Sequence, residues 1–412
     1  MEASLDSCTD RIDSRVGGVD SCAGDSCVDR ADSRADGVPT GKQPVSARPS
    51  HRQYHPDSHR LADWTTLGVG ADAETVVCAR SEEEIIETVT EADRVGKPLL
   101  MLGGGSNIVP SDQPFEGVVV RDMREELEVL HNSGCGGVEV RVSAGHAWDT
   151  LVARAVQEDW MGFEALSGIP GTVGAAPVQN IGAYGQEVAS LVSSLWVYDR
   201  LTRSRRQLFV ADLQMGYRTS VLKRSLHDAR ISQGKTWRNT GRWIVLSVDF
   251  HTPHASLSAP IGYAQLANAL GCELGQRVDN RQVRAAVLAL RESKSMVLDD
   301  ANQNTYSAGS FFTNPIVDAE RASQIDPQAP RFPVGDGQVK LSAAWLIAHS
   351  GFDKGYRLNP QAPASLSTDH VLAITNRGGA RAQDIRALAS AVQQGVRAQW
   401  GIELVPEPVY LQ

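Results

Sequence analysis

The chain has 412 residues, of which 42% are hydrophobic and 22% charged, and its formal net charge is -9. This length predicts two or three domains, and the composition is that of an ordinary globular protein, so most of the chain is expected to fold. The negative charge gives no general attraction to nucleic acid or anionic lipid, and no apolar run reaches the roughly 20 residues that span a bilayer. We therefore expect neither a nucleic-acid-binding protein nor a membrane protein.

The start of the chain and its cysteine usage both favour the cytoplasm. No basic region followed by an apolar segment opens the sequence, so no secretory signal is expected. Of six cysteines, Cys8, Cys22 and Cys27 lie in the first tenth of the chain, the others are far apart, and no CxxC pair occurs. A disulfide framework needs more cysteines and a zinc site needs closer ones, so we expect free thiols and no metal.

Residues 1 to about 60 differ from the rest of the chain. They repeat Asp-Ser and Asp-Arg pieces with few large apolar side chains, which predicts a disordered tail without a catalytic role. After this tail, residues 75–79 form a predicted strand, Ser81 caps a predicted helix that runs to Val95, and residues 98–102 form the next strand. The order predicts a small βαβ unit.

The rest of the chain mixes strand-length apolar runs with helical periodicity. The predicted strands are residues 118–121, 127–130, 137–143, 195–198, 205–209, 243–250 and 371–376. The predicted helices are residues 148–158, 280–291, 343–349 and 382–400. This mixture predicts an α+β fold.

Glycine-rich stretches carry the first hint of chemistry. Residues 68–73 fit a loose GxGxxA dinucleotide pattern, but a strand follows where a Rossmann turn needs a helix, so we reject a Rossmann site there. Residues 102–107, Leu-Gly-Gly-Gly-Ser-Asn, follow a strand, and their consecutive backbone N–H groups could hold a diphosphate. A tight turn that needs positive φ explains the same run equally well.

A longer stretch, residues 162–185, is dense in glycine and alanine. Such a backbone can lie flat against a planar ligand, because larger side chains would hold the two apart. The stretch therefore predicts a ligand contact.

Residues 162–185 together with residues 102–107 closely resemble the FAD-binding region of the UDP-N-acetylenolpyruvoylglucosamine reductase family. Further motifs follow in that family's order, so the resemblance covers nearly everything from Trp64 to the C-terminus. These motifs are Gly216-Tyr217-Arg218-Thr219-Ser220, Arg291-Glu292-Ser293-Lys294, Ala308-Gly309-Ser310-Phe311-Phe312-Thr313-Asn314-Pro315 and Leu404-Val405-Pro406-Glu407-Pro408.

The resemblance implies an α+β chain with an FAD-binding fold of the vanillyl-alcohol-oxidase type in two lobes, followed by a C-terminal α+β substrate-binding domain. The implied divisions are a tail at 1–60, FAD lobes at 61–125 and 126–255, and at 256–412 a substrate-binding domain ending in a catalytic strand. The long form of the family has an extra loop after Tyr217, and residues 225–240 could supply it.

The resemblance also implies an activity. It is the NADPH-dependent reduction of UDP-N-acetylglucosamine-enolpyruvate to UDP-N-acetylmuramate, through non-covalent FAD, on the route to peptidoglycan. The expected partners are the UDP-sugar and NADPH, and we expect a cytoplasmic monomer.

Three residues carry the implied chemistry. Ser310 resembles the family's proton donor, and a positioned acid contributes about 100-fold to 10,000-fold in rate. Arg218 would pair with the substrate carboxylate, because a guanidinium stays charged when partly buried and offers paired donors. Glu407 resembles the family's terminal glutamate, whose pKa burial could raise.

The remaining assignments are contacts to cofactor and substrate. The FAD contacts expected from the resemblance are Gly103, Gly104, Gly105, Ser106, Asn107, Gly168, Ile169, Pro170, Gly171, Gly174, Ala175, Gln179, Asn180, Gly182 and Ala183. The expected substrate contacts are Tyr217, Lys294 and Asn314, with Lys294 meeting phosphate. His370 is either near the substrate or a satisfied structural histidine, and His146 is structural or a neighbour of the flavin.

Two other functions stay open at the level of sequence. One is another flavin oxidase or dehydrogenase of the same fold, because a fold does not fix a reaction. The other is an inactive binding protein for flavin or a UDP-sugar. The presence of Arg218, Ser310 and Glu407 argues against both.

Overall fold

The computed structural model describes residues 57–411. The predicted tail, with Cys8, Cys22 and Cys27, lies almost entirely outside the described residues. A short 3-10 helix, η1 (Leu61–Trp64), opens the described part of the chain.

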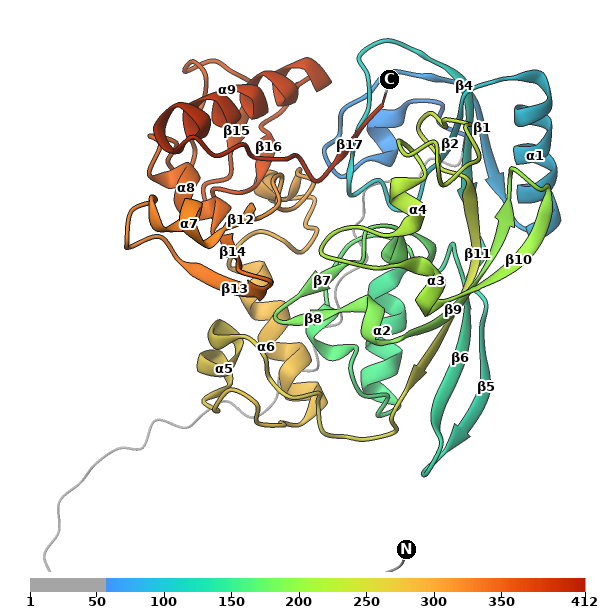
Figure 1. Ribbon diagram of the computed structural model, residues 1–412. Helices are drawn as coiled ribbons and strands as arrows, with labels where there is room; N and C mark the ends of the chain where they lie inside the picture. The colour runs from blue at the N-terminus through green and yellow to red at the C-terminus, as the bar shows by residue number, and fades with distance from the viewer. Residues whose placement is uncertain (1–56, 412) are drawn as a thin grey trace, which may run out of the picture. The chain divides into compact units, whose positions relative to one another are not determined.

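The first sheet confirms the predicted βαβ unit. It has parallel strands in the order β1-β4-β2, formed by β1 (Ala73–Ala79), β2 (Leu99–Met101) and β4 (Phe115–Asp122). Helix α1 (Glu82–Val95) packs Ile85, Val89 and Ala92 against it. Figure 1 shows this helix, in blue, beside the sheet. Ser81 Oγ accepts a hydrogen bond from Glu84 N at 3.1 Å, which is the predicted N-cap.

The second sheet is five-stranded and antiparallel, in the order β10-β9-β11-β6-β5. Its strands are β5 (Leu127–Ser133), β6 (Gly137–Ser143), β9 (Val192–Asp199), β10 (Ser204–Phe209) and β11 (Trp243–Thr252). Helix α2 (Trp148–Gln157) contributes Trp148 to a core in which the rings of Phe163 and Phe250 lie 5.5 Å apart. The predicted strands of this region are confirmed.

Short elements between these strands carry the glycine stretch and the segment after it. They are η2 (Glu164–Leu166), η3 (Val173–Val178), β7 (Gly182–Ala183), β8 (Gln186–Glu187), η4 (Val188–Ser190), α3 (Val210–Leu213) and α4 (Val221–Arg224).

The C-terminal part packs helices around small sheets and is coloured from olive and gold at α5 and α6 to orange and red in Figure 1. Its helices are α5 (Ala264–Leu270), α6 (Asn280–Glu292), η5 (Gln303–Thr305), α7 (Ala319–Ser323), α8 (Ala343–Ala348) and α9 (Ala382–Trp400). Its strands are β12 (Ile316–Asp318), β13 (Arg331–Gly335), β14 (Gln338–Leu341), β15 (Ala364–Leu366) and β16 (Ile374–Asn376). The strand predicted at 371–376 is shorter, because Ala373 N turns back to His370 O at 3.1 Å.

The end of the chain returns to the first glycine loop. Strand β17 (Val409–Tyr410) pairs in parallel with β3 (Ile108–Val109), and Val409 N donates to Asn107 O at 3.0 Å. This pairing places Glu407 beside the loop at 102–107. The division into lobes at 61–125, 126–255 and 256–412 stays a prediction.

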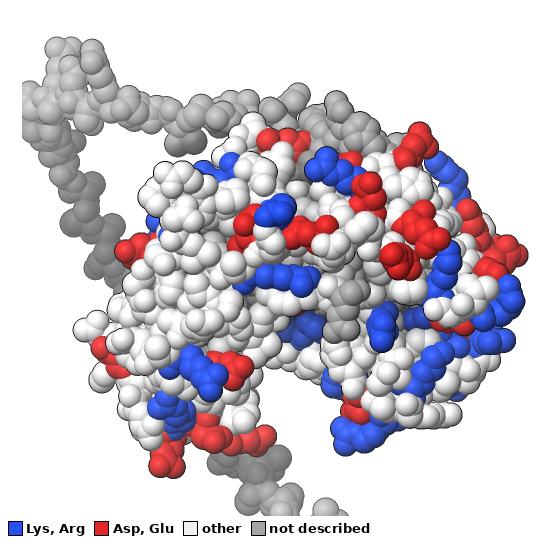
Figure 2. Space-filling view, turned by 90° about the horizontal axis from the view of Figure 1, so that it is seen from above, with Lys and Arg blue, Asp and Glu red and all other residues white. Residues whose placement is uncertain are grey.

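The described residues 57–411 contain no helix that is both long enough and apolar enough to cross a membrane. On the face that Figure 2 presents, acidic and basic side chains are interspersed.

Candidate active site

A cavity of about 640 Å³ runs along both glycine stretches and reaches the C-terminal part of the chain. Its volume lies in the usual range for cofactor and ligand sites. Of the predicted site residues, it is lined by Gly103, Gly104, Gly105, Ser106, Asn107, Ile169, Pro170, Gly171, Gly174, Ala175, Gln179, Gly182, Ala183, Arg218, Lys294, Ser310, Asn314 and Glu407. Gly168, Asn180 and Tyr217 lie outside this lining.

The glycines let the two stretches pack against each other and against neighbouring strands. A Cβ on Gly104 would lie 2.6 Å from Gly171 Cα, and one on Gly174 would lie 2.4 Å from Ala144 Cβ. Gly105 has φ of 62°, and a Cβ there would meet Trp64 O at 1.9 Å. The need for glycine at these three positions therefore comes from protein contacts. The sequence alone suggested a diphosphate loop or a tight turn for Gly104 and Gly105, and contact with a flat ligand for Gly174.

A chain of amides links the first glycine loop to Glu407. Asn107 Nδ2 donates to Gln179 Oε1, and also to the backbone oxygen of Glu407 at 3.3 Å. Gln179 Nε2 in turn donates to Glu407 Oε1 at 3.2 Å. Asn107 and Gln179, both predicted as FAD contacts, therefore also orient the carboxyl group of Glu407.

The guanidinium of Arg218 is held at three points. Its terminal nitrogens donate to Asn180 O at 3.2 Å and to Gly182 O at 2.6 Å, and its Nε lies 3.3 Å from Glu407 Oε1. The backbone of Arg218 is left-handed, with φ of 55°, inside a tight turn closed by Gly216 and Thr219. This turn aims the side chain at the cavity.

Asn180 has a structural part in this arrangement. It is 1% exposed, and its Nδ2 donates to Glu187 Oε2 at 2.7 Å and to Gly216 O at 3.1 Å. It thereby ties the glycine stretch to the turn that carries Arg218.

Glu407 is a nearly buried carboxyl group between two cations. Burial raises its pKa above the ordinary value, and the charges of Arg218 and Lys223 offset part of that rise. Glu407 N donates to Phe311 O at 2.9 Å, which ties the terminal motif to the residue after Ser310.

Ser310 follows Gly309, whose φ is 68°, and precedes the fully buried Phe311. Phe311 N donates to Leu372 O at 2.7 Å, so the backbone next to the serine is fixed. Ser310 is half-buried and lines the cavity together with Arg218 and Glu407. The fold thus brings all three predicted catalytic residues to one cavity.

Tyr217 and Asn314, both predicted as substrate contacts, are held together by a hydrogen bond. The Tyr217 hydroxyl accepts a hydrogen bond from Asn314 N at 3.3 Å, and burial raises the pKa of this tyrosine. Asn314 Oδ1 accepts from Ala343 N at 2.9 Å. Asn314 lines the cavity, its oxygen is engaged at the start of α8, and its side chain also hydrogen-bonds with Tyr217.

Lys294 and His370 line the same cavity. Lys294 Nζ donates to Gln265 Oε1 at 2.7 Å, and burial, followed by the charge of Arg291, lowers its pKa. Burial, with smaller contributions from Lys294 and Lys354, lowers the pKa of His370 to about 4. His146 Nδ1 lies 2.9 Å from Ala147 O, and this buried histidine is not among the cavity-lining residues.

Among the cavity-lining residues that sequence reasoning did not assign are Lys223, Tyr184, Tyr263 and Arg291. Lys223 lies on the first turn of α4, and Tyr184 meets Tyr263 edge to face at a ring-centre distance of 5.7 Å. Burial lowers the pKa of Arg291, and within residues 57–411 its Nε has no hydrogen-bond partner. Arg291 lies three residues before Lys294 in a motif that the sequence analysis quoted, so its helical spacing could have revealed it.

The fold and the cavity define a cofactor-dependent oxidoreductase of the two-lobed flavin class. Residues 73–200 match the family model described as FAD binding domain, and residues 300–411 match the C-terminal domain of UDP-N-acetylenolpyruvoylglucosamine reductase. The chain belongs to the UDP-N-acetylenolpyruvoylglucosamine reductase family.

Similar proteins support this assignment. A UDP-N-acetylenolpyruvoylglucosamine reductase of Cutibacterium acnes is 46% identical over 348 residues, which cover 84% of this chain and 88% of the relative. One of Thermobifida fusca is 46% identical over 361 residues, covering 85% and 96%. A solved reductase of the same name from Thermus caldophilus, at 24% identity and a TM-score of 0.55 over 86% of this chain and 97% of its own, shares the fold.

The residues present fit FAD. The loop at 103–107 lines the cavity at the point where the backbones of Gly104 and Gly171 nearly touch. The loop and the glycine stretch that contains Gly171 consist largely of small residues, which leave backbone N–H groups accessible to a ligand. The cavity is also lined by Thr240, whose hydroxyl accepts a hydrogen bond from Met101 N just before the loop, and by Glu407, whose backbone oxygen accepts one from Asn107 at the end of the loop. An extended dinucleotide with its diphosphate at the loop matches that layout.

Proposed function

We propose that this protein reduces UDP-N-acetylglucosamine-enolpyruvate to UDP-N-acetylmuramate with NADPH as reductant, a step in the synthesis of peptidoglycan precursors. The observation that carries the proposal is the convergence of Arg218, Ser310 and Glu407 on one cavity lined by two glycine stretches. Bound FAD would take hydride from NADPH and supply it to the enol ether. The protein must then hold the substrate carboxylate and deliver a proton to the neighbouring carbon.

We assign to Arg218 the task of balancing the negative charge that builds on the substrate carboxylate. Two backbone carbonyls and Glu407 orient its guanidinium before any substrate binds. A preoriented donor costs little reorganisation during the reaction, so it stabilises the transition state more than the free substrate. The Lys223 ammonium, in the same cavity, adds to the positive potential.

We assign the donation of the proton to Ser310. Ser310 lines the same cavity as Glu407, and the backbone of the next residue, Phe311, is fixed by hydrogen bonds to Leu372 and Glu407. The carboxyl of Glu407, whose pKa burial raises, can be protonated closer to neutral pH than an ordinary glutamate. It can therefore donate a hydrogen bond to the developing enolate or to the group that replenishes the serine proton.

The substrate-binding end contains donors suited to a diphosphate and a sugar. Lys294 offers a point charge. Asn314 offers its side-chain NH₂ group, while its side-chain oxygen accepts a hydrogen bond from Ala343 N. Tyr217 acts through Asn314, because its hydroxyl accepts the Asn314 backbone N–H. We assign Lys294 and Asn314 to direct contact and Tyr217 to positioning.

The proposal extends to the cellular setting, where we expect a monomer in the cytoplasm.

The rival reaction is that of another flavin enzyme of the same fold. Arg218 and Glu407 favour the enolpyruvyl sugar over the substrates of other flavin enzymes. The Arg218 cation can bind the carboxylate of this sugar, and the Glu407 carboxyl group, whose pKa is raised, can stabilise the anion that forms during the reaction.

An anaerobic stopped-flow experiment tests the proposal. The full-length protein is mixed with NADPH and then with UDP-N-acetylglucosamine-enolpyruvate while the flavin absorbance is followed. We expect NADPH to bleach the flavin and the sugar to restore its colour. Bleaching without recovery would point to another flavoenzyme, and absence of any bound flavin would point to a binding protein.

A further inference from the structure

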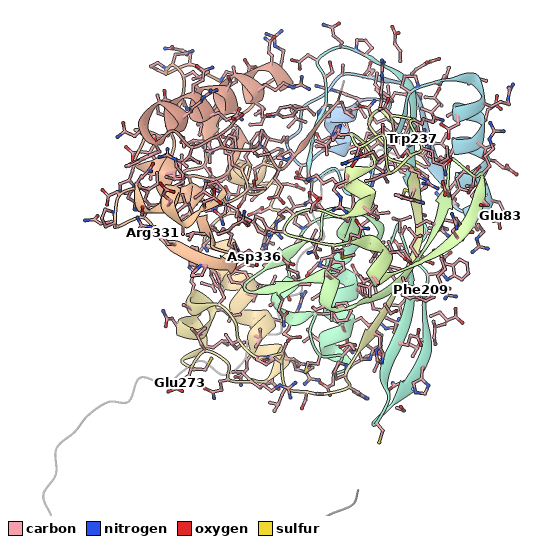
Figure 3. All side chains as sticks on the ribbon, in the orientation of Figure 1. Glu83, Phe209, Trp237, Glu273, Arg331 and Asp336 are labelled. Atoms are coloured by element: carbon pink, nitrogen blue, oxygen red, sulfur yellow. The ribbon has the colours of Figure 1, made fainter. Side chains whose placement is uncertain are left out.

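Helix α6 leads from the surface of the molecule to the cavity. It follows an exposed loop that carries Glu273, which Figure 3 labels, and it ends at Glu292. Arg291 in its last turn and Lys294 just after it line the cavity. The position of α6 against the rest of the fold therefore determines where these two cations lie.

An ion pair joins the middle of α6 to helix α2. The two terminal nitrogens of Arg284 donate to the two carboxyl oxygens of Asp149, at 2.7 and 2.9 Å. The side chains are only 11% and 21% exposed, so solvent and salt screen the pair little. Two parallel bonds between a guanidinium and a carboxylate fix orientation as well as distance. The pair therefore holds α6 in one place on α2.

Asp149 also binds the second glycine stretch. Its Oδ1 accepts a hydrogen bond from Gly168 N at 2.6 Å, and the next two residues, Ile169 and Pro170, line the cavity. Burial acts to raise the pKa of Asp149, but the bonds and charge of Arg284, with the Gly168 N–H, outweigh it and lower this pKa. The ionised carboxylate thus joins two walls of the cavity.

The glycine stretch and α6 are in direct contact beside this carboxylate. A Cβ on Gly168 would lie 2.9 Å from Leu288 Cδ2 and 3.3 Å from Arg291 Nε. Arg291 in turn exchanges two hydrogen bonds of 2.9 Å with the backbone of Met296, so the turn that carries Lys294 moves with it. A shift of α6 would therefore displace both cations relative to the glycine stretch.

We propose that the Asp149–Arg284 pair positions the cations at the end of α6, and above all Lys294, for binding the diphosphate of the substrate. Neither Asp149 nor Arg284 is among the cavity-lining residues, so both act through the residues that they hold. They are positioning residues and not catalytic ones. This inference rests on the proposed function, in which Lys294 contacts the UDP-sugar.

The proposal predicts which kinetic constant responds. Lys294 contacts a part of the substrate that does not react, so its contact is equally strong in the bound substrate and in the transition state. Losing such a contact raises the substrate concentration that is needed without slowing the chemical step. A displaced α6 should therefore weaken sugar binding and leave the limiting rate of flavin reoxidation nearly unchanged.

The test variant is Arg284→Met, which removes the guanidinium and keeps an apolar side chain of similar length. Reduced full-length holoenzyme is mixed anaerobically with increasing UDP-N-acetylglucosamine-enolpyruvate, and flavin reoxidation is followed. We expect the half-saturating sugar concentration to rise about tenfold, the effect of losing one good contact, and the limiting rate to stay within about threefold. Arg284→Lys, which keeps the charge, should recover part of the affinity.

The matched control is Arg281→Met. Arg281 lies on the same helix and pairs with Asp159 at 3.2 Å, but its side chain is 53% exposed and outside the cavity lining. Because exposed ion pairs contribute little, its half-saturating concentration should stay within about twofold of wild type. Equal weakening in both variants, or a limiting rate that falls as far as the affinity, would overturn the proposal.

A second variant guards against a failure of Arg284→Met to fold. Asp149→Asn keeps an oxygen for Gly168 N and removes the charge that Arg284 needs, so it should weaken sugar binding in the same direction. Unchanged affinity in the folded variants of both residues would also overturn the proposal.

Hydrogen exchange of the holoenzyme without substrate separates this inference from the proposed function. The amides of Lys294 and Met296, both bonded to Arg291 O, should exchange about tenfold faster in Arg284→Met and unchanged in Arg281→Met. If the sugar does not reoxidise wild-type protein, the proposed reaction fails, and the exchange rates still decide whether the pair holds α6. If the reaction proceeds and neither measurement moves, only the positioning role fails.

Discussion

Arg218 Nε lies 3.3 Å from Glu407 Oε1, although the two residues come from distant parts of the chain. The other guanidinium nitrogens are bound by carbonyls of the glycine stretch, at Asn180 and Gly182. The glycine stretch therefore orients the cation, and the C-terminal motif supplies its counter-charge. A substrate carboxylate that enters this cavity meets an arginine whose geometry is already set.

Replacing Arg218 with Lys tests that geometry. The lysine keeps the positive charge but cannot bind both carbonyls and Glu407 at once, so we expect reoxidation of the flavin by the enolpyruvyl sugar to slow by about 100-fold. Reduction of the flavin by NADPH should change much less. Single-turnover stopped-flow measurements of the two half-reactions distinguish these effects.

The matched control for this variant is Arg224→Lys. Arg224 lies six residues later, binds Gln214 through two nitrogens and is outside the cavity lining. Its replacement should leave both half-reactions within about twofold. Equal slowing in the two variants would mean that Arg218 acts only through folding.

Replacing Ser310 with Ala tests the proton donor. We expect the reoxidation step to slow by about 100-fold to 10,000-fold, because a positioned acid is lost, while reduction by NADPH stays nearly intact. The control is Ser293→Ala, which removes an exposed hydroxyl bound to Leu290 O. Similar losses in both half-reactions of Ser310→Ala would contradict the assignment of the serine as proton donor.

His370 makes the stability of the protein depend on pH. Its pKa is about 4 in the folded protein and 6.5 in an ordinary environment, so the unfolded chain binds more protons between these values. Neutral His370 therefore leaves the free energy of unfolding at its full value above pH 6.5. This contribution is lost as the pH falls towards 4. Between pH 7 and pH 4, wild-type protein should lose about 2–3 kcal/mol more free energy of unfolding than His370→Gln.

Urea unfolding at several pH values checks this expectation. His254→Gln, at an exposed histidine, should follow the wild-type pH profile. A wild-type profile in His370→Gln would show that the burial of His370 does not govern its protonation.

The sequence predicted the fold well where local patterns decide it. The capped helix at 82–95 and the strands at 137–143 and 243–250 form as expected, the last running two residues further, because capping and apolar runs are local properties. It predicted less where long-range packing decides. The turn at Ala373 shortens the strand expected at 371–376, and the pairing of β17 with β3 has no local signal.

The candidate site shows the same division. Motifs placed Arg218, Ser310 and Glu407, and the fold brings them to one cavity. Lys223 and the segment of residues 225–242, which connects α4 to β11, were not assigned, because their place in the cavity depends on distant partners. The segment is fixed by ion pairs such as that of Arg200 with Asp93, in which Arg200 also donates to Thr240 O. These residues lie too far apart along the chain for a local sequence pattern to reveal the pair.

The contact between the two glycine stretches gives the last prediction. A Cβ on Gly104 would lie 2.6 Å from Gly171 Cα, so Gly104→Ala must push the two loops apart. Overpacking of this kind costs about 1–3 kcal/mol, and the displaced loop would also lose its fit to a diphosphate. We expect at least about a tenfold weaker affinity for FAD, measured by release of flavin fluorescence from the holoenzyme on dilution.

The control is Gly134→Ala, on the hairpin between β5 and β6, where an added Cβ has nothing within 4 Å. This variant should retain FAD as the wild type does, because alanine there displaces no neighbour. If Gly104→Ala also retained FAD, the close approach of the two loops would not be needed for flavin binding. The glycines at 103–105 would then serve only the folding of the loop, which is the tight-turn interpretation that the sequence left open.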